Sequence, residues 1–229
     1  TLLEMSRGAE RVITYAEHVP ALVEGEVAPH DGELFLHFRW IAPALPFPLQ
    51  EVRTHLVGDY NLPNALAAIA IGLFFDLPVV LINEALSSYV PSNSRSQLIL
   101  SPRGNRIIAD AYNANPSSMR TAIHNFLHIP PTDAPRILIL GDMNELGAAS
   151  ESAHHELLEE IRRAGQPLQL YLCGPCWMRE LAAQPNPEVA VFAEVGELIQ
   201  SLEAGPLTDS LILIKGSNGI KLGSVLEYL

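Results

Sequence analysis

Residues 109–120, ADAYNANPSSMR, decide the fold, because they join an apolar run to a helical pattern. The run NRIIADAY ends inside this stretch, and Asn115-Pro116 marks the start of a helix. Proline fits the first helical position, and asparagine is a strong cap. The helix expected over residues 117–128 has an apolar stripe of Met119, Ala122, Ile123, Phe126 and Leu127. The stretch therefore predicts a strand, a turn and an amphipathic helix.

Alternating strands and helices continue to the end of the sequence. Further strands are expected at RILILG (136–141), LQLYLCG (168–174), EVAVFA (188–193) and SLILIKG (210–216). Helices are expected near residues 152–164, 176–183, 195–204 and 219–229. The runs SQLILSP and NRIIADAY predict a hairpin across residues 102–105. This order predicts an α/β fold with a mainly parallel sheet, helices on both faces, and ligands beyond the carboxyl ends of the strands.

The first 89 residues have a different pattern. Strand-forming runs are ERVITYA (10–16), ELFLHFRW (33–40) and VRTHLV (52–57), and a proline-rich connection precedes the last of them. A helix over residues 61–75 is apolar on every side, so we expect it to be buried, and a second helix is expected over 78–88. The polar stretch VPSNSRS (90–96) predicts a boundary between one domain at 1–89 and another at 90–229.

Composition limits the partners and the compartment. The chain has 229 residues, a net charge of −12 and 48% hydrophobic residues. The negative charge argues against nucleic acid or an anionic membrane as a general partner. No apolar run is long enough for a membrane span, and no signal peptide is visible. Two cysteines predict a reducing cytoplasm, and the first residue, Thr1, predicts a fragment or a processed product.

Polar residues gather at two predicted element ends. Asp110 can accept hydrogen bonds from a ribose diol, Tyr112 can stack on a base, and Asn113 can serve either the loop or a ligand. In GDYNLPNALAAIA (58–70), Asn61 and Asn64 share one face of a helix start, and their amides suit an adenine edge. A capped turn and two helix caps explain the same residues without a ligand.

Five stretches together resemble a known family. In sequence order they are YNLPNALAAIA (60–70), SRSQ (94–97), ADAYNANPSSMRTAI (109–123), LGDMNELGAASESAHHE (140–156) and LILIKGS (211–217). As a set they resemble the Mur ligases of peptidoglycan synthesis. The third and fourth stretches are most similar to the branch that adds D-alanyl-D-alanine to UDP-N-acetylmuramoyl-tripeptide. The resemblance covers nearly the whole chain, more loosely over residues 1–50.

This resemblance implies a fold and a reaction. Residues 1–89 would be the end of a central ATPase domain, and residues 90–229 a Rossmann-like carboxyl-terminal domain. ATP would activate the tripeptide carboxylate as an acyl phosphate, and the amine of D-alanyl-D-alanine would attack it. Mg²⁺ would be needed, with its ligands upstream of this segment. The implied compartment is the cytoplasm.

The resemblance also implies residues for ATP. Asn61 and Asn64 would face adenine, and Arg95 would approach ATP from the domain hinge. Asp110 would hold the ribose, in a wall shaped by Tyr112, Asn113 and Asn115.

The incoming dipeptide and the acyl phosphate are implied to lie near two loops. Asp142 and Glu145 would position the dipeptide, whose ammonium group attracts carboxylates. Lys215 would act catalytically and Ser217 would bind substrate, near the position of the acyl phosphate or of the dipeptide carboxylate. The alternatives remain open: Asp142 caps a turn, Glu145 is a solvated loop charge, and Lys215 and Ser217 only end a strand.

The sequence departs from the family pattern in three places. Tyr60 stands where the family often has histidine, and Asn218 stands where many members carry arginine. No G-x-x-x-x-G-K-[ST] phosphate loop occurs in the sequence. We therefore expect no catalysis from this segment alone.

Other functions remain as alternatives. In CGPC (173–176), Cys173 and Cys176 have the spacing of a thioredoxin-like dithiol oxidoreductase. In SAHHE (152–156), the histidines lack H-E-x-x-H spacing and an evident third ligand, so we expect His154 and His155 on the helix surface. A non-catalytic nucleotide-binding module is the third alternative.

Overall fold

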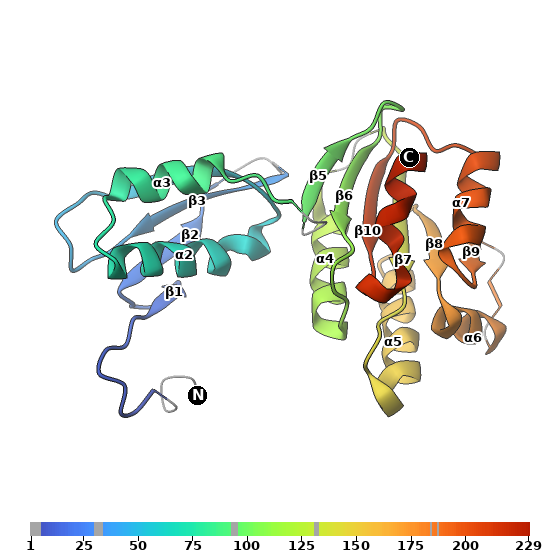
Figure 1. Ribbon diagram of the computed structural model, residues 1–229, viewed down its shortest axis with the longest axis horizontal. Helices are drawn as coiled ribbons and strands as arrows, with labels where there is room; N and C mark the ends of the chain where they lie inside the picture. Colours follow the sequence, from blue (N-terminus) through green and yellow to red (C-terminus); the bar gives the residue numbers. More distant parts are fainter. Residues whose placement is uncertain (1–5, 30–33, 93–95, 131–132, 184, 187) are drawn as a thin grey trace. The chain divides into compact units, whose positions relative to one another are not determined.

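The structure is a computed structural model that describes residues 6–29, 34–92, 96–130, 133–183, 185–186 and 188–229 (Figure 1). The chain divides into two compact units, Thr1–Val90 and Pro91–Leu229. Each unit has its own sheet and its own buried core.

The first unit is a four-stranded sheet covered by two helices. Its strands, β1 (Tyr15–Glu17), β2 (Val23–Val27), β3 (Phe35–Ile41) and β4 (Gln50–Val57), lie in sequence order. Only the β1–β2 pair is parallel. After the short 3₁₀ helix η1 (Asp59–Asn61) come the helices α2 (Leu62–Phe74) and α3 (Val79–Ser88). The core between helices and sheet contains Leu36, Phe38, Trp40, Leu62, Leu66 and Ile69.

Two expectations about this unit are wrong. Helix α2 is not buried on every side, since Ile71 is 59% exposed and Phe75, directly after the helix, is 68% exposed. One sheet layer covers only one side of a helix, whatever the apolar content of the other. Strand β2 was missed because VEGEV carries a central glycine and two glutamates.

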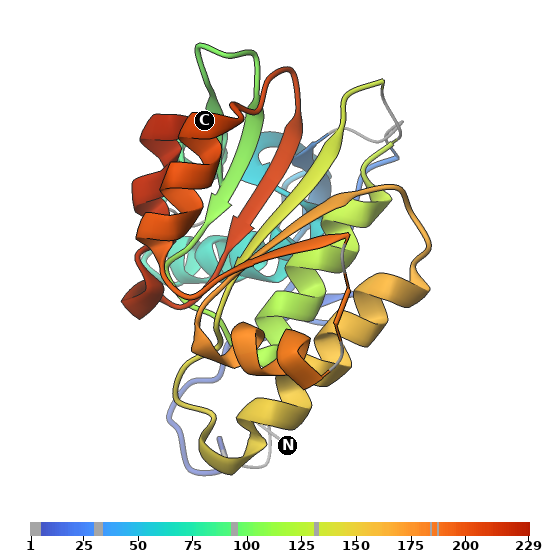
Figure 2. The same cartoon turned by 90° about the vertical axis from the view of Figure 1, so that its right-hand side faces the viewer.

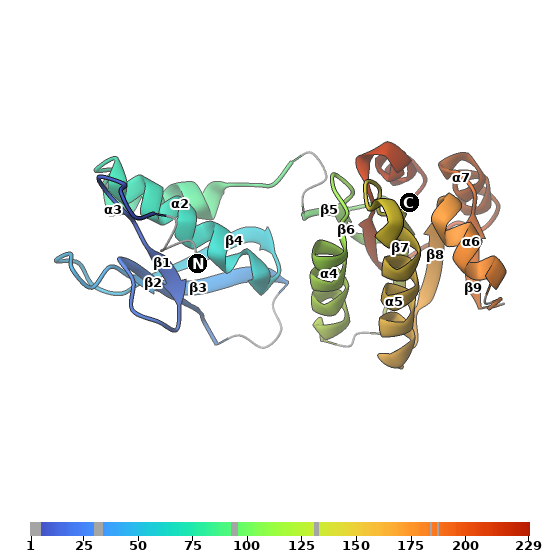
Figure 3. The ribbon, with the colours of Figure 1, turned by 90° about the horizontal axis from the view of Figure 1, so that it is seen from below.

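The second unit is a six-stranded sheet between two layers of helices (Figure 2). In chain order its elements are β5 (Gln97–Leu100), β6 (Arg106–Asp110), α4 (Pro116–His128), β7 (Arg136–Gly141), η2 (Gly147–Ala149), α5 (Ser150–Arg163), β8 (Gln169–Cys173), α6 (Pro175–Ala183), β9 (Val189–Phe192), α7 (Val195–Ala204), β10 (Leu211–Lys215), η3 (Asn218–Ile220) and η4 (Leu222–Tyr228). The strand order is β5-β6-β10-β7-β8-β9, and only β5 is antiparallel to its neighbour. Helices α4, α5 and α6 cover one face, and α7 and η4 cover the other (Figure 3).

The predicted α/β fold and the predicted hairpin are confirmed. Gln97 pairs with Ala109, and Leu100 pairs with Arg106, on either side of the expected turn. The predicted apolar stripe of α4 is buried. The single helix expected over 219–229 is replaced by η3 and η4, because Lys221 between them has a left-handed φ of 60°.

Strand β10 is last in sequence but lies between β6 and β7. Three carboxyl ends therefore meet: Lys215 is in register with Asp110 on one side and with Leu140 on the other. Two glycines allow the backbones to approach just beyond these ends. A Cβ on Gly216 would lie 2.8 Å from the Cα of Gly141.

The predicted start of α4 is confirmed. The Asn115 side chain accepts a hydrogen bond from the Ser118 amide at 2.8 Å, and the Ser118 hydroxyl bonds the Asn115 amide at 3.1 Å. Pro116 occupies the first turn. This is a reciprocal capping box.

The cap gives a first prediction. We expect Asn115→Ala to lower the free energy of unfolding by about 1 kcal/mol, because the Ser118 amide loses its acceptor. Asn115→Asp keeps an acceptor oxygen at the helix amino-terminus, so its stability should stay close to that of the unchanged protein. Urea unfolding of the three proteins measures the difference. Equal losses in both variants would contradict this role of Asn115.

Candidate site at the carboxyl ends of the central strands

The centre of the candidate site is a charge pair. The ammonium of Lys215 donates to Oδ2 of Asp110 at 2.6 Å and to the carbonyl of Asn113 at 3.1 Å. The lysine side chain is 3% exposed and the aspartate side chain 19%. A buried ammonium needs a partner of opposite charge, and the strand register brings Asp110 to it. Two predicted site residues, assigned to different ligands, thus bind each other.

Free hydrogen-bonding capacity remains around this pair. An ammonium has three donors, and the protein uses two of those of Lys215. Within the described part of the chain, Oδ1 of Asp110 has no protein hydrogen bond. Beside the pair, Tyr112 and Asn113 lie exposed on the turn that leads to α4. The oxygen of Asn115 is already used in the helix cap.

The asparagines of the first unit contact each other, as their spacing predicts. Asn61 is buried; its amide donates to the Val57 carbonyl at 2.9 Å, and its Oδ1 accepts from Asn64 at 3.0 Å. Neither caps α2 with its side chain. Asn61 thus has a structural role, and Asn64 is the exposed member of the pair. Arg95 lies outside the described residues.

Asp142 is buried beneath the loop that follows β7. Its carboxylate accepts from the amide of Cys176 at 2.9 Å and from that of Trp177 at 3.2 Å, at the first turn of α6. Gly174 makes room for it, because a Cβ there would lie 2.4 Å from the carboxylate carbon. These contacts favour the turn-cap alternative for Asp142 over contact with a dipeptide.

Ser217 joins the same loop to the end of β10. Its hydroxyl accepts from the amide of Asn144 at 2.8 Å, and its own amide donates to the carbonyl of Asp142 at 3.1 Å. The loop tip is exposed, and Glu145 adopts a left-handed φ of 65° there. Among the residues predicted on these two loops, Glu145 is therefore the one whose side chain faces solvent.

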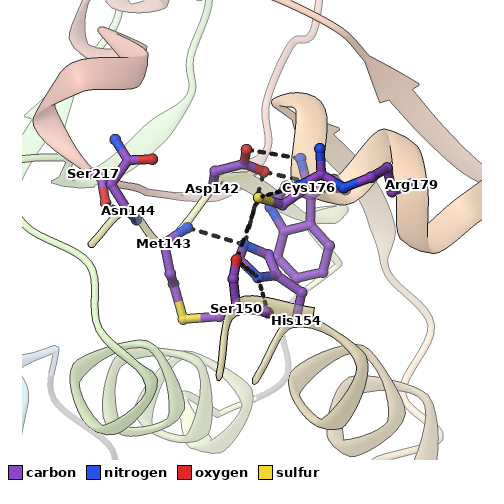
Figure 4. Close-up of polar contacts among 9 residues, drawn as sticks. Asp142, Met143, Asn144, Ser150, His154, Cys176, Arg179 and Ser217 are labelled. Carbon is purple, nitrogen blue, oxygen red and sulfur yellow. Dashed lines mark hydrogen bonds and ion pairs between the residues drawn. The ribbon is translucent and has the colours of Figure 1, made fainter. Parts of the chain in front are cut away.

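The expectation that His154 lies on the helix surface is wrong. It is 1% exposed and belongs to the buried stripe of α5, with Ala153, Leu157, Leu158 and Ile161. Its Nδ1 bonds the Ser150 carbonyl at 2.7 Å, and its Nε2 accepts from the amide of Met143 at 3.0 Å (Figure 4). The apolar spacing around it was the signal that sequence reasoning missed. His155 lies further out and pairs with Glu180 at 2.9 Å.

The two cysteines have different surroundings. Both are free. Cys173 is buried in the core cluster that includes Leu198 and Ile214, and this burial, helped by the charge of Asp142, raises the pKa of its thiol to about 12. Cys176 is half-buried and contacts Ser150 and Arg179 instead. Since dithiol exchange needs an available thiolate, this arrangement gives no support to a thioredoxin-like function.

Among the described residues, no helix combines the length and apolar character needed to cross a membrane. The strand order defines an α/β domain of the doubly wound type, a class whose ligand sites lie beyond the carboxyl ends of the strands. The family model "Mur ligase, glutamate ligase domain" matches residues 94–218, more than half of the chain. The chain therefore belongs to the Mur ligase family, and the predicted resemblance is confirmed.

Curated relatives agree with this family. The chain is 31% identical over 175 residues to a UDP-N-acetylmuramoyl-tripeptide–D-alanyl-D-alanine ligase of Treponema pallidum, covering 75% of this chain and 37% of that protein. It is 32% identical over 178 residues to the Bacillus subtilis ligase of the same name, covering 76% and 38%. The chain thus spans well under half the length of these relatives.

Solved structures show the same fold. The similarity to MurF from Acinetobacter baumannii has a TM-score of 0.79 at 24% identity and covers 98% of this chain and 49% of that one. MurF from Thermotoga maritima, a complex with ADP, gives 0.69 at 20% identity and covers 91% and 46%.

The charge pair gives a second prediction. Lys215→Met leaves the Asp110 carboxylate without its cation, and Asp110→Asn leaves a buried ammonium without its anion, so each should lower the free energy of unfolding. The double variant removes both charges and should lose less than the sum, by roughly 0.5–3 kcal/mol. Urea unfolding of the four proteins at pH 7 measures this coupling. Strictly additive losses would contradict an energetically coupled pair.

Proposed function

We propose that this chain is part of an ATP-dependent ligase that adds D-alanyl-D-alanine to UDP-N-acetylmuramoyl-tripeptide through an acyl phosphate. The observation that carries the proposal is the Asp110–Lys215 pair, at the adjoining carboxyl ends of β6 and β10. The names of the curated relatives supply the substrates. In this proposal residues 1–89 form the end of the central ATPase domain, and the protein works in the cytoplasm.

The proposed roles follow from the hydrogen-bonding atoms that Asp110 and Lys215 have not used on each other. Oδ1 of Asp110 accepts a hydroxyl of the ATP ribose, while Oδ2 keeps hold of Lys215. The free hydrogen of Lys215 binds an anionic oxygen of the acyl phosphate or of the tetrahedral species formed from it. Asp110 thus binds ribose and also positions the lysine. Tyr112 and Asn113 form the exposed wall beside them.

The remaining predicted residues divide into those proposed to contact a ligand and those proposed to hold them in place. Asn64 keeps an exposed amide for adenine, and Asn61 orients it. Glu145 attracts the dipeptide ammonium, and Asp142 and Ser217 hold the loop that carries it. Arg95 is proposed to approach the phosphates of ATP from the hinge.

Mg²⁺ prefers oxygen ligands with several waters. In the described part of the chain, three groups that can bind a metal converge at one place, Asp142, His154 and Cys176, and two of their three donors are nitrogen and sulfur. This set does not fit Mg²⁺, so the proposal places the Mg²⁺ ligands and the phosphate loop outside these residues.

The function is tested on the intact protein encoded by the reading frame that contains this chain. With ATP, Mg²⁺, UDP-N-acetylmuramoyl-tripeptide and D-alanyl-D-alanine, we expect ADP, phosphate and UDP-N-acetylmuramoyl-pentapeptide, detected by mass spectrometry. Omission of any one substrate should abolish the product. Nucleotide binding without pentapeptide under these conditions would instead favour a non-catalytic nucleotide-binding module.

The roles in the pair predict different kinetic defects in that intact enzyme. Charge-assisted hydrogen bonds contribute roughly 1.5–3 kcal/mol each. Asp110→Ala should therefore raise KM for ATP at least ~10-fold, about 1.4 kcal/mol of binding, and change KM for D-alanyl-D-alanine little. Asp110→Ala should also lower kcat, because it releases Lys215, whereas Lys215→Met should lower kcat and change KM for ATP little.

Steady-state kinetics with each substrate varied, beside a thermal melt, separates these effects. Glu203→Ala removes an exposed carboxylate from α7, on the other face of the sheet, and is the matched control. An unchanged KM for ATP in Asp110→Ala would exclude ribose binding by Asp110.

A further inference from the structure

Three side chains that can bind a metal converge beneath the loop after β7 (Figure 4). They are Asp142 after β7, His154 on α5 and Cys176 at the start of α6. One ligand atom from each lies within 4.8 Å of the other two, and His154 Nε2 lies 3.8 Å from Asp142 Oδ1. We propose that these three residues form a Zn²⁺ site, separate from the charge pair of Asp110 and Lys215.

The donor set fits zinc. Zn²⁺ binds cysteine sulfur at about 2.3 Å and histidine nitrogen or carboxylate oxygen at about 2.0–2.2 Å, so the ligand atoms of a tetrahedral site lie roughly 3.3–3.7 Å apart. Side-chain shifts of about an ångström would bring the three ligand atoms from their present separations to those of a tetrahedral site. Thiolate and imidazole are ligands that zinc prefers over magnesium or calcium. Three protein ligands leave a fourth position for water.

Each of the three side chains has a lone pair that a metal ion can use. Each carboxylate oxygen of Asp142 accepts one backbone N–H and keeps a second lone pair. His154 donates Nδ1–H to the Ser150 carbonyl, which leaves the lone pair on Nε2, as outer hydrogen bonds do for metal-binding histidines. In the present arrangement the Met143 amide occupies the Nε2 lone pair and Nδ1 carries a hydrogen, so the three residues are not a nucleophile–base triad.

Metal binding changes two existing contacts. Zn²⁺ takes the Nε2 lone pair that now accepts from the Met143 amide, so the Met143 peptide must move away from its present position. Cys176 binds as a thiolate, so its thiol proton is released to solvent. Arg179, which now contacts the sulfur at 3.2 Å, is exposed and has room to move aside.

The site is therefore connected to the loop above it. Met143 is followed by Asn144, which is tied to Ser217, and then by the exposed Glu145. Loss of the Met143 hydrogen bond loosens the base of this loop. The amide of Met143 is the reporter of this change.

The test is a titration of the 229-residue chain with Zn²⁺ against a competing chelating dye, repeated with Co²⁺ as a spectroscopic probe. We expect one ion per chain, release of protons, and a thiolate-to-cobalt charge-transfer band. Cys176→Ser should abolish that band and weaken Zn²⁺ binding at least ~100-fold, since loss of a second-shell partner alone costs 10–100-fold. Binding should weaken as pH falls, because protons compete for the sulfur and the nitrogen.

Two neighbouring residues give matched controls. Cys173→Ala removes the other thiol, which lies in the core cluster with Leu198 and Ile214, and His155→Gln removes the adjacent histidine. Both should keep the affinity, whereas His154→Gln should lose it. A thermal melt of each variant confirms folding. Because His154 is buried, the inference depends on Cys176→Ser if His154→Gln does not fold.

Hydrogen exchange at the Met143 amide distinguishes a metal site from a cluster with only a structural role, because only a metal site makes the exchange rate depend on Zn²⁺. Zn²⁺ should speed exchange at the Met143 amide and leave the Ser118 amide of the α4 cap unchanged.

Three results would overturn the site: no binding at micromolar Zn²⁺, affinity that survives Cys176→Ser, or affinity lost in His124→Gln. The last would assign the ion to the stacked surface pair His124 and His128.

Discussion

A charged residue at the end of a fully buried strand constrains the second unit. All five residues of β10 are buried, and the fifth is Lys215. An ammonium removed from water needs strong acceptors, and a carboxylate offsets its charge best, so a position of β10 beside a strand that ends in one is favoured. Strand β6 ends in Asp110, in register with Lys215. The same insertion of β10 between β6 and β7 brings Ser217 to the loop that follows β7.

Buried polar groups organise that loop from below. Asp142 is fixed by the first amides of α6, and His154 holds the Met143 amide from α5. Ser217 holds the next amide, that of Asn144, from the end of β10. The amides of Met143 and Asn144 are both hydrogen-bonded, and the loop is attached to three elements. Only its tip, with Glu145, is left to face solvent.

Sequence periodicity predicted the elements of the second unit well, because its strands are continuous apolar runs and its helices are amphipathic. The cap at Asn115 was predictable because it needs only local residues. The Asp110–Lys215 pair joins residues 105 positions apart, and no local pattern indicates that β10 lies beside β6. Sequence reasoning placed both residues at strand ends but gave them separate ligands.

Chemical type misled the prediction where burial was decisive. A histidine pair followed by glutamate suggests a solvated helix face, yet His154 occupies the buried stripe. For Asp142, whose oxygens bond the start of α6, the role toward the dipeptide stays a prediction. At α2 the error is the reverse: its apolar residues predicted burial on every side, but Ile71 is exposed.

The Met143 amide connects the two proposed sites. His154 Nε2 has one lone pair, so it serves either this amide or a metal ion. An ion at Asp142, His154 and Cys176 therefore favours loop arrangements in which Met143 is released. A substrate that requires the present loop, with Asn144 held by Ser217, favours the arrangement in which Met143 stays bound. By linkage each ligand must weaken the other by the same factor, although the two need share no atom.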